Sequence, residues 1–171
     1  MIYLMGKMIF LVTGGAGFIG SALIRELIKD KSNIVINVDN LSYSGNLEST
    51  PDPEKNKNYF FERCDITNKE NTSAIVSKYQ PNVIFHLAAE SHVDRSISGP
   101  EQFIMSNIIG TFNLLEASKN LCKENKSHPG FNFRFHHIST DEVFGDLEPN
   151  QDPFDENSIY KPSSPYAASK A

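Results

Sequence analysis

Two neighbouring acidic residues, Asp141 and Glu142, follow Thr140 and the apolar run 131–138. The run predicts a buried strand. A carboxyl pair at the end of such a strand is unfavourable for folding, because like charges and desolvation both disfavour ionising it. Adjacent carboxyl groups of this kind can divide into one acid and one base. We therefore expect Thr140, Asp141 and Glu142 to belong to a site that moves protons.

A tyrosine and a lysine follow further along, in the segment Tyr166-Ala167-Ala168-Ser169-Lys170. Residues four apart on a helix share one face. A phenol has a reference pKa of about 10, so its anion must be stabilised before it can act as a base near neutrality. A neighbouring ammonium, or the positive ring of a bound nicotinamide, is a suitable source. By itself the spacing is common and is equally typical of an exposed helix pair.

A glycine-rich segment, Gly14-Gly15-Ala16-Gly17-Phe18-Ile19-Gly20, lies between the first predicted strand and the first predicted helix. Side chains at its glycines would block a tight turn, the approach of a pyrophosphate to backbone amides, or the packing of helix against strand. We expect Gly14, Gly17, Phe18, Ile19 and Gly20 to contact a dinucleotide. The motif by itself is also compatible with a glycine-rich turn that has no function.

Asp39 ends the second predicted strand, where a carboxylate can accept both hydroxyls of a ribose. It would repel the extra phosphate of NADP, so NAD is the expected cofactor. The alternative is that Asp39 is simply a turn residue before Asn40. We expect Asn40 to lie beside Asp39 in the cofactor site.

Two further segments lie where strands end. Asp65-Ile66 is expected to hold the adenine, and Leu87-Ala88-Ala89 to let the cofactor lie close to the backbone. A helix cap explains Asp65 nearly as well, and core packing explains the small residues.

The elements that must position these residues follow from apolar periodicity and turn signals. Strands are predicted over residues 8–13, 33–39, 59–63, 83–88 and 131–139. Helices are predicted over 18–29, from a cap at Thr67 or Asn68 to 79, and over 100–125, with a surface loop over 41–58. Strand and helix thus alternate five times. This order predicts an α/β fold, a Rossmann-like doubly wound parallel sheet covered on both faces, with its ligand site beyond the carboxyl ends of the strands.

Composition narrows the class of protein. The 171 residues suffice for one domain or slightly more, and the formal charge of −5 offers no general attraction for nucleic acid or anionic lipid. Cys64 and Cys122 fit no metal or redox spacing, so free thiols in a reducing cytoplasm are expected. The vicinal His136 and His137 would point to opposite faces of a strand and suggest no metal site.

No membrane or export segment is expected. The longest apolar runs are shorter than the roughly 20 residues of a membrane span. Residues 1–5 faintly resemble a signal-peptide core, but Lys7 interrupts it and no cleavage site follows.

The end of the chain is unusual for a complete domain. Ser163-Ser164-Pro165 is a good helix start, yet the chain stops at Ala171. We expect residues 1–171 to be an incomplete NAD-binding domain, truncated before its last strands and a C-terminal substrate domain.

Several of these motifs together resemble the extended short-chain dehydrogenase/reductase family. They are residues 13–20, Asp65-Ile66, His86-Leu87-Ala88-Ala89 and the segment from Tyr166 to Lys170. Within that family, residues 39–46, 88–96 and 135–145 are similar to those of nucleotide-sugar 4,6-dehydratases. The resemblance implies NAD as cofactor, dTDP-glucose as substrate, a 4-keto-6-deoxy sugar as product for deoxysugar biosynthesis, and a homodimer built on the two long helices after the fourth and fifth strands.

The resemblance also implies roles. Tyr166, held by Lys170 and Thr140, would take the proton from the sugar's 4-hydroxyl during its oxidation. Glu142 would then remove the proton on carbon 5, and Asp141 would protonate the departing 6-hydroxyl. Further positions of the family's site fall on Ser91, His92, Asp94 and Arg95 for the sugar or its pyrophosphate, and on Asn107 as a support. Phe144 stands where many relatives have tyrosine, so one secondary hydrogen bond is in doubt.

Two other readings stay open. An epimerase or decarboxylase of the same family would share Tyr166 and Lys170 but has no need of the acid and base at 141 and 142, and this favours the dehydratase. The other reading is a catalytically inactive NAD-binding fragment.

Overall fold

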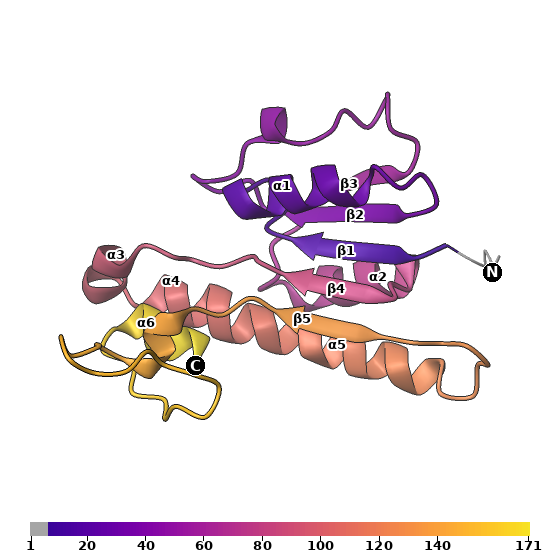
Figure 1. Ribbon diagram of the computed structural model, residues 1–171. Coiled ribbons are helices and arrows are strands. Elements are labelled where there is room, and N and C mark those ends of the chain that lie inside the picture. Colours follow the sequence, from indigo (N-terminus) through magenta and orange to yellow (C-terminus); the bar gives the residue numbers. More distant parts are fainter. Residues whose placement is uncertain (1–6) are drawn as a thin grey trace.

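Five parallel strands form a single sheet in the computed structural model, which describes residues 7–171 (Figure 1). They are β1 (Ile9–Thr13), β2 (Ile34–Asp39), β3 (Tyr59–Arg63), β4 (Val83–His86) and β5 (Arg134–His137). In the order β3-β2-β1-β4-β5, successive strands are added on one side of β1 up to β3 and on its other side from β4 onward. A ligand crevice forms at such a switch point, here between β1 and β4. The predicted Rossmann-like parallel sheet is confirmed. The signal-peptide comparison falls on residues 1–5, which lie outside the described residues.

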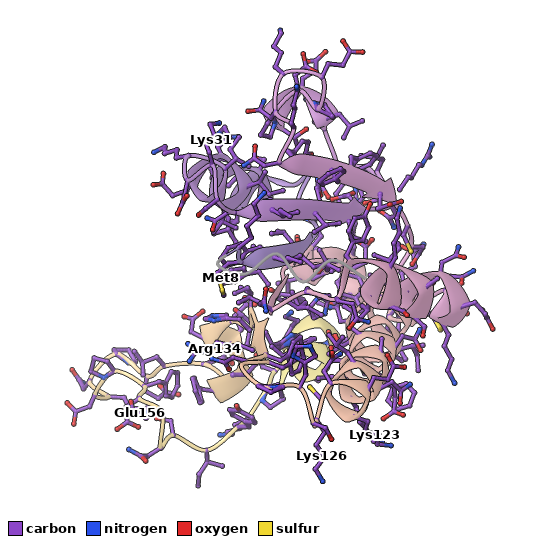
Figure 2. All side chains as sticks on the ribbon, turned by 90° about the vertical axis from the view of Figure 1, so that its right-hand side faces the viewer. Met8, Lys31, Lys123, Lys126, Arg134 and Glu156 are labelled. Carbon is purple, nitrogen blue, oxygen red and sulfur yellow. The ribbon has the colours of Figure 1, made fainter. Side chains whose placement is uncertain are left out.

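Helices cover the two faces of the sheet, as Figure 2 shows from the amino ends of the strands. On one face lies α1 (Phe18–Leu27), whose Ile24 clusters with Val12 and Val35. On the other lie α2 (Lys69–Tyr79) and α5 (Thr111–Glu124), over a core that includes Leu11, Ile36, Val76, Ile84 and Leu121. Burial of each such aliphatic side chain contributes about 1.5–3 kcal/mol, so the two clusters hold the strand ends in place.

The connection from β2 to β3 breaks the predicted alternation. It is a loop with one short helical turn, η1 (Leu47–Ser49), so the surface loop predicted over 41–58 is confirmed but the count of five strand–helix pairs is wrong. The boundaries of α2 follow the predicted signals. Asn68 accepts a hydrogen bond from the amide of Asn71, and Gln80 ends the helix in the left-handed conformation.

The long helix predicted over 100–125 is divided into α4 (Glu101–Phe103), a π-helical segment η2 (Ile104–Gly110), and α5. An additional helix, α3 (Val93–Ser98), precedes it. The inward residues of the π-helical segment are Asn107 and Gly110, and a Cβ on Gly110 would lie 2.5 Å from Cδ1 of Ile66. Apolar spacing does not reveal this segment, because neither inward residue is apolar.

The last strand is shorter and less buried than predicted. Arg134 and His136 are exposed, while the residues between and after them are half-buried. β5 is an edge strand. On the face that α1 covers, the helix packs over β1 and β2 and does not extend to β5, so that face of β5 is open to solvent. His136 stacks near Phe85 and His137 near His86, which confirms that the two histidines point to opposite faces. No helix among the described residues is long and apolar enough to cross a membrane.

Candidate active site and cofactor cleft

The glycine-rich turn follows β1 directly and is held against β2 and β4. The amide of Gly14 donates a hydrogen bond of 2.9 Å to the carbonyl of Val38. Gly14 has φ of +68°, and a Cβ there would lie 2.7 Å from the amide nitrogen of Ala88. A Cβ on Gly20 would overlap the backbone of Gly14 and Gly15. The turn therefore needs glycine at both positions to bring helix and strands this close.

Gly14→Ala is expected to lower the free energy of unfolding by about 2–4 kcal/mol, because the left-handed conformation costs a non-glycine residue about 1–2 kcal/mol and the new Cβ meets backbone atoms. Urea unfolding measures the change. Gly17→Ala is the matched control, since Gly17 has φ of −78° and its Cβ would meet only the carbonyl oxygen of Gly14, at 3.2 Å. Equal stability of the two variants would contradict the prediction.

Asp39 lies at the end of β2, only 8% exposed. Its Oδ2 accepts a hydrogen bond of 2.9 Å from the amide of Ala16, and its Oδ1 accepts one of 2.8 Å from the amide of Leu41. The carboxylate thus ties the glycine-rich turn to the end of β2, a structural role that the sequence reading treated as an alternative. Each carboxylate oxygen has a second acceptor site, so both roles are compatible.

A cavity of about 350 Å³ lies beyond the carboxyl ends of β1, β2 and β4. It is lined by every residue that the sequence analysis assigned to the cofactor: Gly14, Gly17, Phe18, Ile19, Gly20, Asp39, Asn40, Asp65, Ile66, Leu87, Ala88, Ala89, Tyr166 and Lys170. Residues far apart in the chain therefore meet at one cleft, with small residues and backbone at its centre and carboxylates at its β2 and β3 side.

Other predicted residues divide between the cavity and its surroundings. Ser91 lines the cavity, whereas the ring of His92 lies 5.9 Å from that of Tyr43, outside it. Asp65 accepts hydrogen bonds from the amide and the hydroxyl of Thr67, at 2.9 and 2.8 Å. Asp65 therefore also shapes its own turn, while the cap of α2 is Asn68.

Three of the predicted catalytic residues lie together beside Tyr166, which lines the cavity: Thr140, Asp141 and Glu142. Thr140 caps the short helix η3 (Asp141–Phe144), and its Oγ1 lies 3.4 Å from Oδ1 of Asp141 and 3.5 Å from Oε2 of Glu142. The Thr140 side chain also lies close enough to the phenol of Tyr166 to lower its pKa. One threonine therefore contacts both carboxylates and the phenol.

The carboxyl pair differs from the prediction in its surroundings. Asp141 and Glu142 are exposed and line no part of the cavity, because β5 ends at His137 and the chain has already turned outward into η3. The expectation that burial makes the pair unfavourable is wrong. Proximity to Tyr166, rather than desolvation, is what distinguishes these two carboxylates.

The helix α6 (Pro165–Lys170) carries Tyr166 and Lys170. Ser164 caps it by accepting a hydrogen bond of 3.0 Å from the amide of Ala167. Ser139, after β5, donates a hydrogen bond of 2.8 Å to the carbonyl of Lys170. A local cap at one end and a tertiary hydrogen bond at the other hold a helix that would be too short to form in isolation.

Burial is the largest cause of the pKa shifts of Tyr166 and Lys170. It raises the pKa of the Tyr166 phenol above its ordinary value; the Thr140 hydrogen bond opposes this, and the carboxylates of Glu142 and Asp141 add to it. Burial also lowers the pKa of Lys170 to about 8. The direction at Tyr166 is the reverse of what a base near neutrality requires.

The sequence analysis missed a hydrogen-bonded histidine beneath the cleft. His86 is fully buried; its Nδ1 lies 2.7 Å from the hydroxyl of Thr13 and its Nε2 lies 2.8 Å from that of Thr111. The Thr111 hydroxyl donates to the carbonyl of Asn107, so it accepts from His86, and the ring is neutral with its proton on Nε2. Burial accordingly lowers the pKa of His86 to about 3. A histidine within an apolar strand was the available signal, because a buried ring needs two partners.

Asn107, at the π-helical segment, links this network to α6. Its side-chain amide donates to the carbonyl of Glu90, at 2.9 Å, and to the hydroxyl of Ser169, at 2.8 Å, while its Oδ1 accepts from the amide of Glu90. Ser169 in turn donates to the carbonyl of Tyr166. The π-helical segment therefore positions the tyrosine helix against the strand that carries the cleft.

Neither cysteine is bonded to another, and residues 7–171 contain no group of three or more His, Cys, Asp or Glu side chains arranged as metal ligands.

Comparisons with known proteins agree with this arrangement. The family profile described as GDP-mannose 4,6 dehydratase matches residues 11–171. A dTDP-glucose 4,6-dehydratase of Neisseria meningitidis is 53% identical over 161 residues, which are 94% of this chain and 45% of that protein. The chain thus spans about half the length of the curated relatives it matches.

Solved structures give the same fold. A dTDP-glucose 4,6-dehydratase of Streptomyces venezuelae with NAD bound superposes with a TM-score of 0.82 at 36% identity, covering 95% of this chain and 48% of that one. A UDP-glucose 4-epimerase of Thermotoga maritima superposes with a TM-score of 0.80 at 36% identity, over 95% and 48% of the two chains. The fold is thus shared by dehydratases and epimerases, and the side chains of the site have to separate them.

Proposed function

The chain belongs to the GDP-mannose 4,6-dehydratase family, and from that premise we propose that it carries the NAD site and the acid–base residues of a dTDP-glucose 4,6-dehydratase. The observation that carries the proposal is the contact of Thr140 with Tyr166, Asp141 and Glu142. An oxidation and an elimination at neighbouring carbons need a base for each step and an acid for the leaving group, and these side chains supply all three.

The cleft suits a dinucleotide. Side chains are excluded at Gly14 and Gly20, so backbone amides at the start of α1 are open to a pyrophosphate. Asp39 offers its remaining acceptor sites to ribose hydroxyls and repels an added phosphate, so NAD is preferred to NADP. Bound in this cleft, NAD would supply hydride transfer, from carbon 4 of the sugar and back to carbon 6, with carbon 5 regaining its proton from Glu142.

Tyr166 takes the proton of the sugar's 4-hydroxyl in the oxidation. Its pKa is raised by burial, so the positive charges of the nicotinamide ring and of Lys170 have to lower it when cofactor and substrate are in place. Lys170 keeps its proton below its pKa of about 8, so it is charged at neutral pH.

Glu142 removes the proton on carbon 5, which the new 4-ketone acidifies, and Asp141 protonates the departing 6-hydroxyl. Because two carboxyl groups this close titrate together, the acid and the base are best described as one coupled pair. Both are exposed, so a bound sugar must itself shield them from water. Ser91 lines the cofactor cavity and is proposed to contact the sugar nucleotide, while His92 and Arg95 contact Tyr43 instead.

Residues 1–171 are proposed to form an NAD-binding domain, with the nucleotide of the substrate bound by a separate domain. A second candidate function is NAD binding without turnover. It is favoured by the exposed carboxyl pair. Within the same family, an epimerase has the same fold but no use for Asp141 and Glu142.

Two measurements on the purified chain separate these functions. Calorimetric titration with NAD tests the cofactor site, and the absorbance of the keto product from dTDP-glucose tests turnover. NAD binding with product formation supports the dehydratase, and NAD binding without product supports the second candidate. Formation of dTDP-galactose without loss of water would instead identify an epimerase.

We also propose a homodimer, built on an exposed apolar stripe along η2 and α5. Its members are Ile104, Ile108, Phe112 and Leu115, each 45–52% exposed. Their spacing places them on one helical side, and an apolar patch of this kind marks an interaction site. Phe112→Asp is expected to weaken dimerisation by about tenfold to a hundredfold in sedimentation equilibrium, because it puts a charge at the centre of the buried face. Ile159→Asp, at an 86% exposed side chain outside the stripe, should leave association unchanged, and equal effects of the two changes would argue against this interface.

A further inference from the structure

A contact just outside the cofactor cleft joins its two walls. Tyr43 lies in the loop after β2, between Ser42 and Ser44, both of which line the cavity. Its ring lies 4.6 Å from the guanidinium of Arg95 and 5.9 Å from the ring of His92. Those two residues follow Ser91, which lines the cavity from the side of β4.

The contact therefore crosses the cleft at the position of β1. This strand lies between β2 and β4, so the glycine-rich turn at its end separates the two walls that Tyr43 and Arg95 connect. Figure 1 shows α3, which contains Arg95, beyond the carboxyl ends of the strands. The loop of Tyr43 is itself fastened to the glycine-rich turn, because the amide of Asn46 donates a hydrogen bond of 2.9 Å to the carbonyl of Ala16.

The chemistry of the contact fits a reversible closure. A guanidinium over the face of a tyrosine ring is attracted by the ring quadrupole, and Arg95 forms no ion pair within residues 7–171 that would compete. Tyr43 is 55% exposed, so separating it from Arg95 disturbs no core. Tyr43 lies in a loop and Arg95 in the short helix α3, so the two can move apart without unfolding a strand.

We propose that Tyr43, His92 and Arg95 form a clasp over the cleft that slows the release of a bound dinucleotide. The inference rests on the proposed function, in which the cofactor ends each turnover in its starting state and has no need to leave. A clasp that opens rarely suits such a cofactor, whereas an enzyme that exchanges its dinucleotide in every turnover would be slowed by it.

The test is the dissociation rate of the cofactor. Bound NADH is displaced by excess NAD, and the loss of its fluorescence is followed by stopped flow. Tyr43→Leu is expected to raise the dissociation rate constant about two- to fivefold, the range that a cation–π contact of this exposure supplies. Tyr43→Phe keeps the ring and is expected to dissociate at the rate of the unchanged protein.

Arg95→Met, which removes the charge but keeps the length, completes a double-mutant cycle with Tyr43→Leu. If the two residues act as one clasp, the double variant dissociates no faster than the faster single variant. Additive effects, or a Tyr43→Leu rate equal to that of the unchanged protein, would overturn the inference while leaving the NAD site intact. Failure of the unchanged protein to bind NADH would overturn the proposed cofactor, and the clasp with it.

Discussion

Glu142→Gln is expected to slow the elimination of water by about 10²–10⁴-fold while leaving the oxidation at carbon 4 nearly unchanged. General bases contribute about this much, and glutamine keeps the shape of the side chain but cannot take a proton. The two steps separate because the phenol of Tyr166, rather than Glu142, serves the oxidation. In a single turnover with dTDP-glucose, the reduced cofactor should therefore accumulate and decay slowly.

The partner of Glu142 provides a second arm of this experiment. Asp141→Asn should also retain the oxidation and slow the elimination, since it removes the acid for the leaving hydroxyl. Because the pair is coupled, the double variant should lose less than the product of the two single effects. Glu148→Gln, at an exposed carboxylate in the following loop, is the matched control and should behave as the unchanged protein. Loss of the first hydride transfer with fast elimination would show that the roles are assigned wrongly.

Tyr166→Phe is expected to slow the first oxidation by about 10²–10⁴-fold, so neither reduced cofactor nor keto product forms. The phenol is the group that lies beside Thr140, Asp141 and Glu142, and phenylalanine keeps the packing of the ring against Phe103. NAD affinity should change by less than about threefold, because the Tyr166 ring remains in the wall of the cavity. Rapid-mixing absorbance of the reduced cofactor measures the oxidation, and calorimetry measures the affinity.

Tyr160→Phe is the matched control for that change. Tyr160 is 60% exposed and its ring packs on Phe144, so loss of its hydroxyl should leave oxidation and binding as they are. A Tyr166→Phe variant that oxidises dTDP-glucose at the original rate would exclude the phenol as the base. The contrast with Glu142→Gln is informative, because one change should prevent the reduced cofactor from forming and the other should make it persist.

Local sequence signals predicted most of the fold. The apolar runs that form β1 and β2 are buried as predicted, and Asn68 and Gln80 mark the ends of α2 by their capping chemistry. The same signals did not predict the segments in which a strand is exposed or a buried residue is not apolar. β5 lies at the edge of the sheet, so its Arg134 and His136 are exposed. In η2 the inward residues are an asparagine and a glycine, which interrupt apolar periodicity.

For the candidate site, the sequence by itself determined the cleft. Every residue assigned to the cofactor lines one cavity. Except for Tyr166 and Lys170 on α6, each ends or follows a parallel strand or begins the helix after it, and the carboxyl ends of such strands meet at one edge of the sheet. The tyrosine and lysine were recoverable for a similar reason, since the spacing of four residues on a helix sets their common side without knowledge of the rest of the molecule.

Only the tertiary structure decided how the remaining polar groups are used. His86 bonds Thr13 and Thr111, Asn107 bonds Glu90 and Ser169, and Tyr43 meets Arg95. These contacts join residues from different elements, and a local pattern records whether a side chain is buried but not which distant partner completes its hydrogen bonds. The same limit applies to Asp141 and Glu142, whose exposure depends on where β5 ends and the chain turns outward.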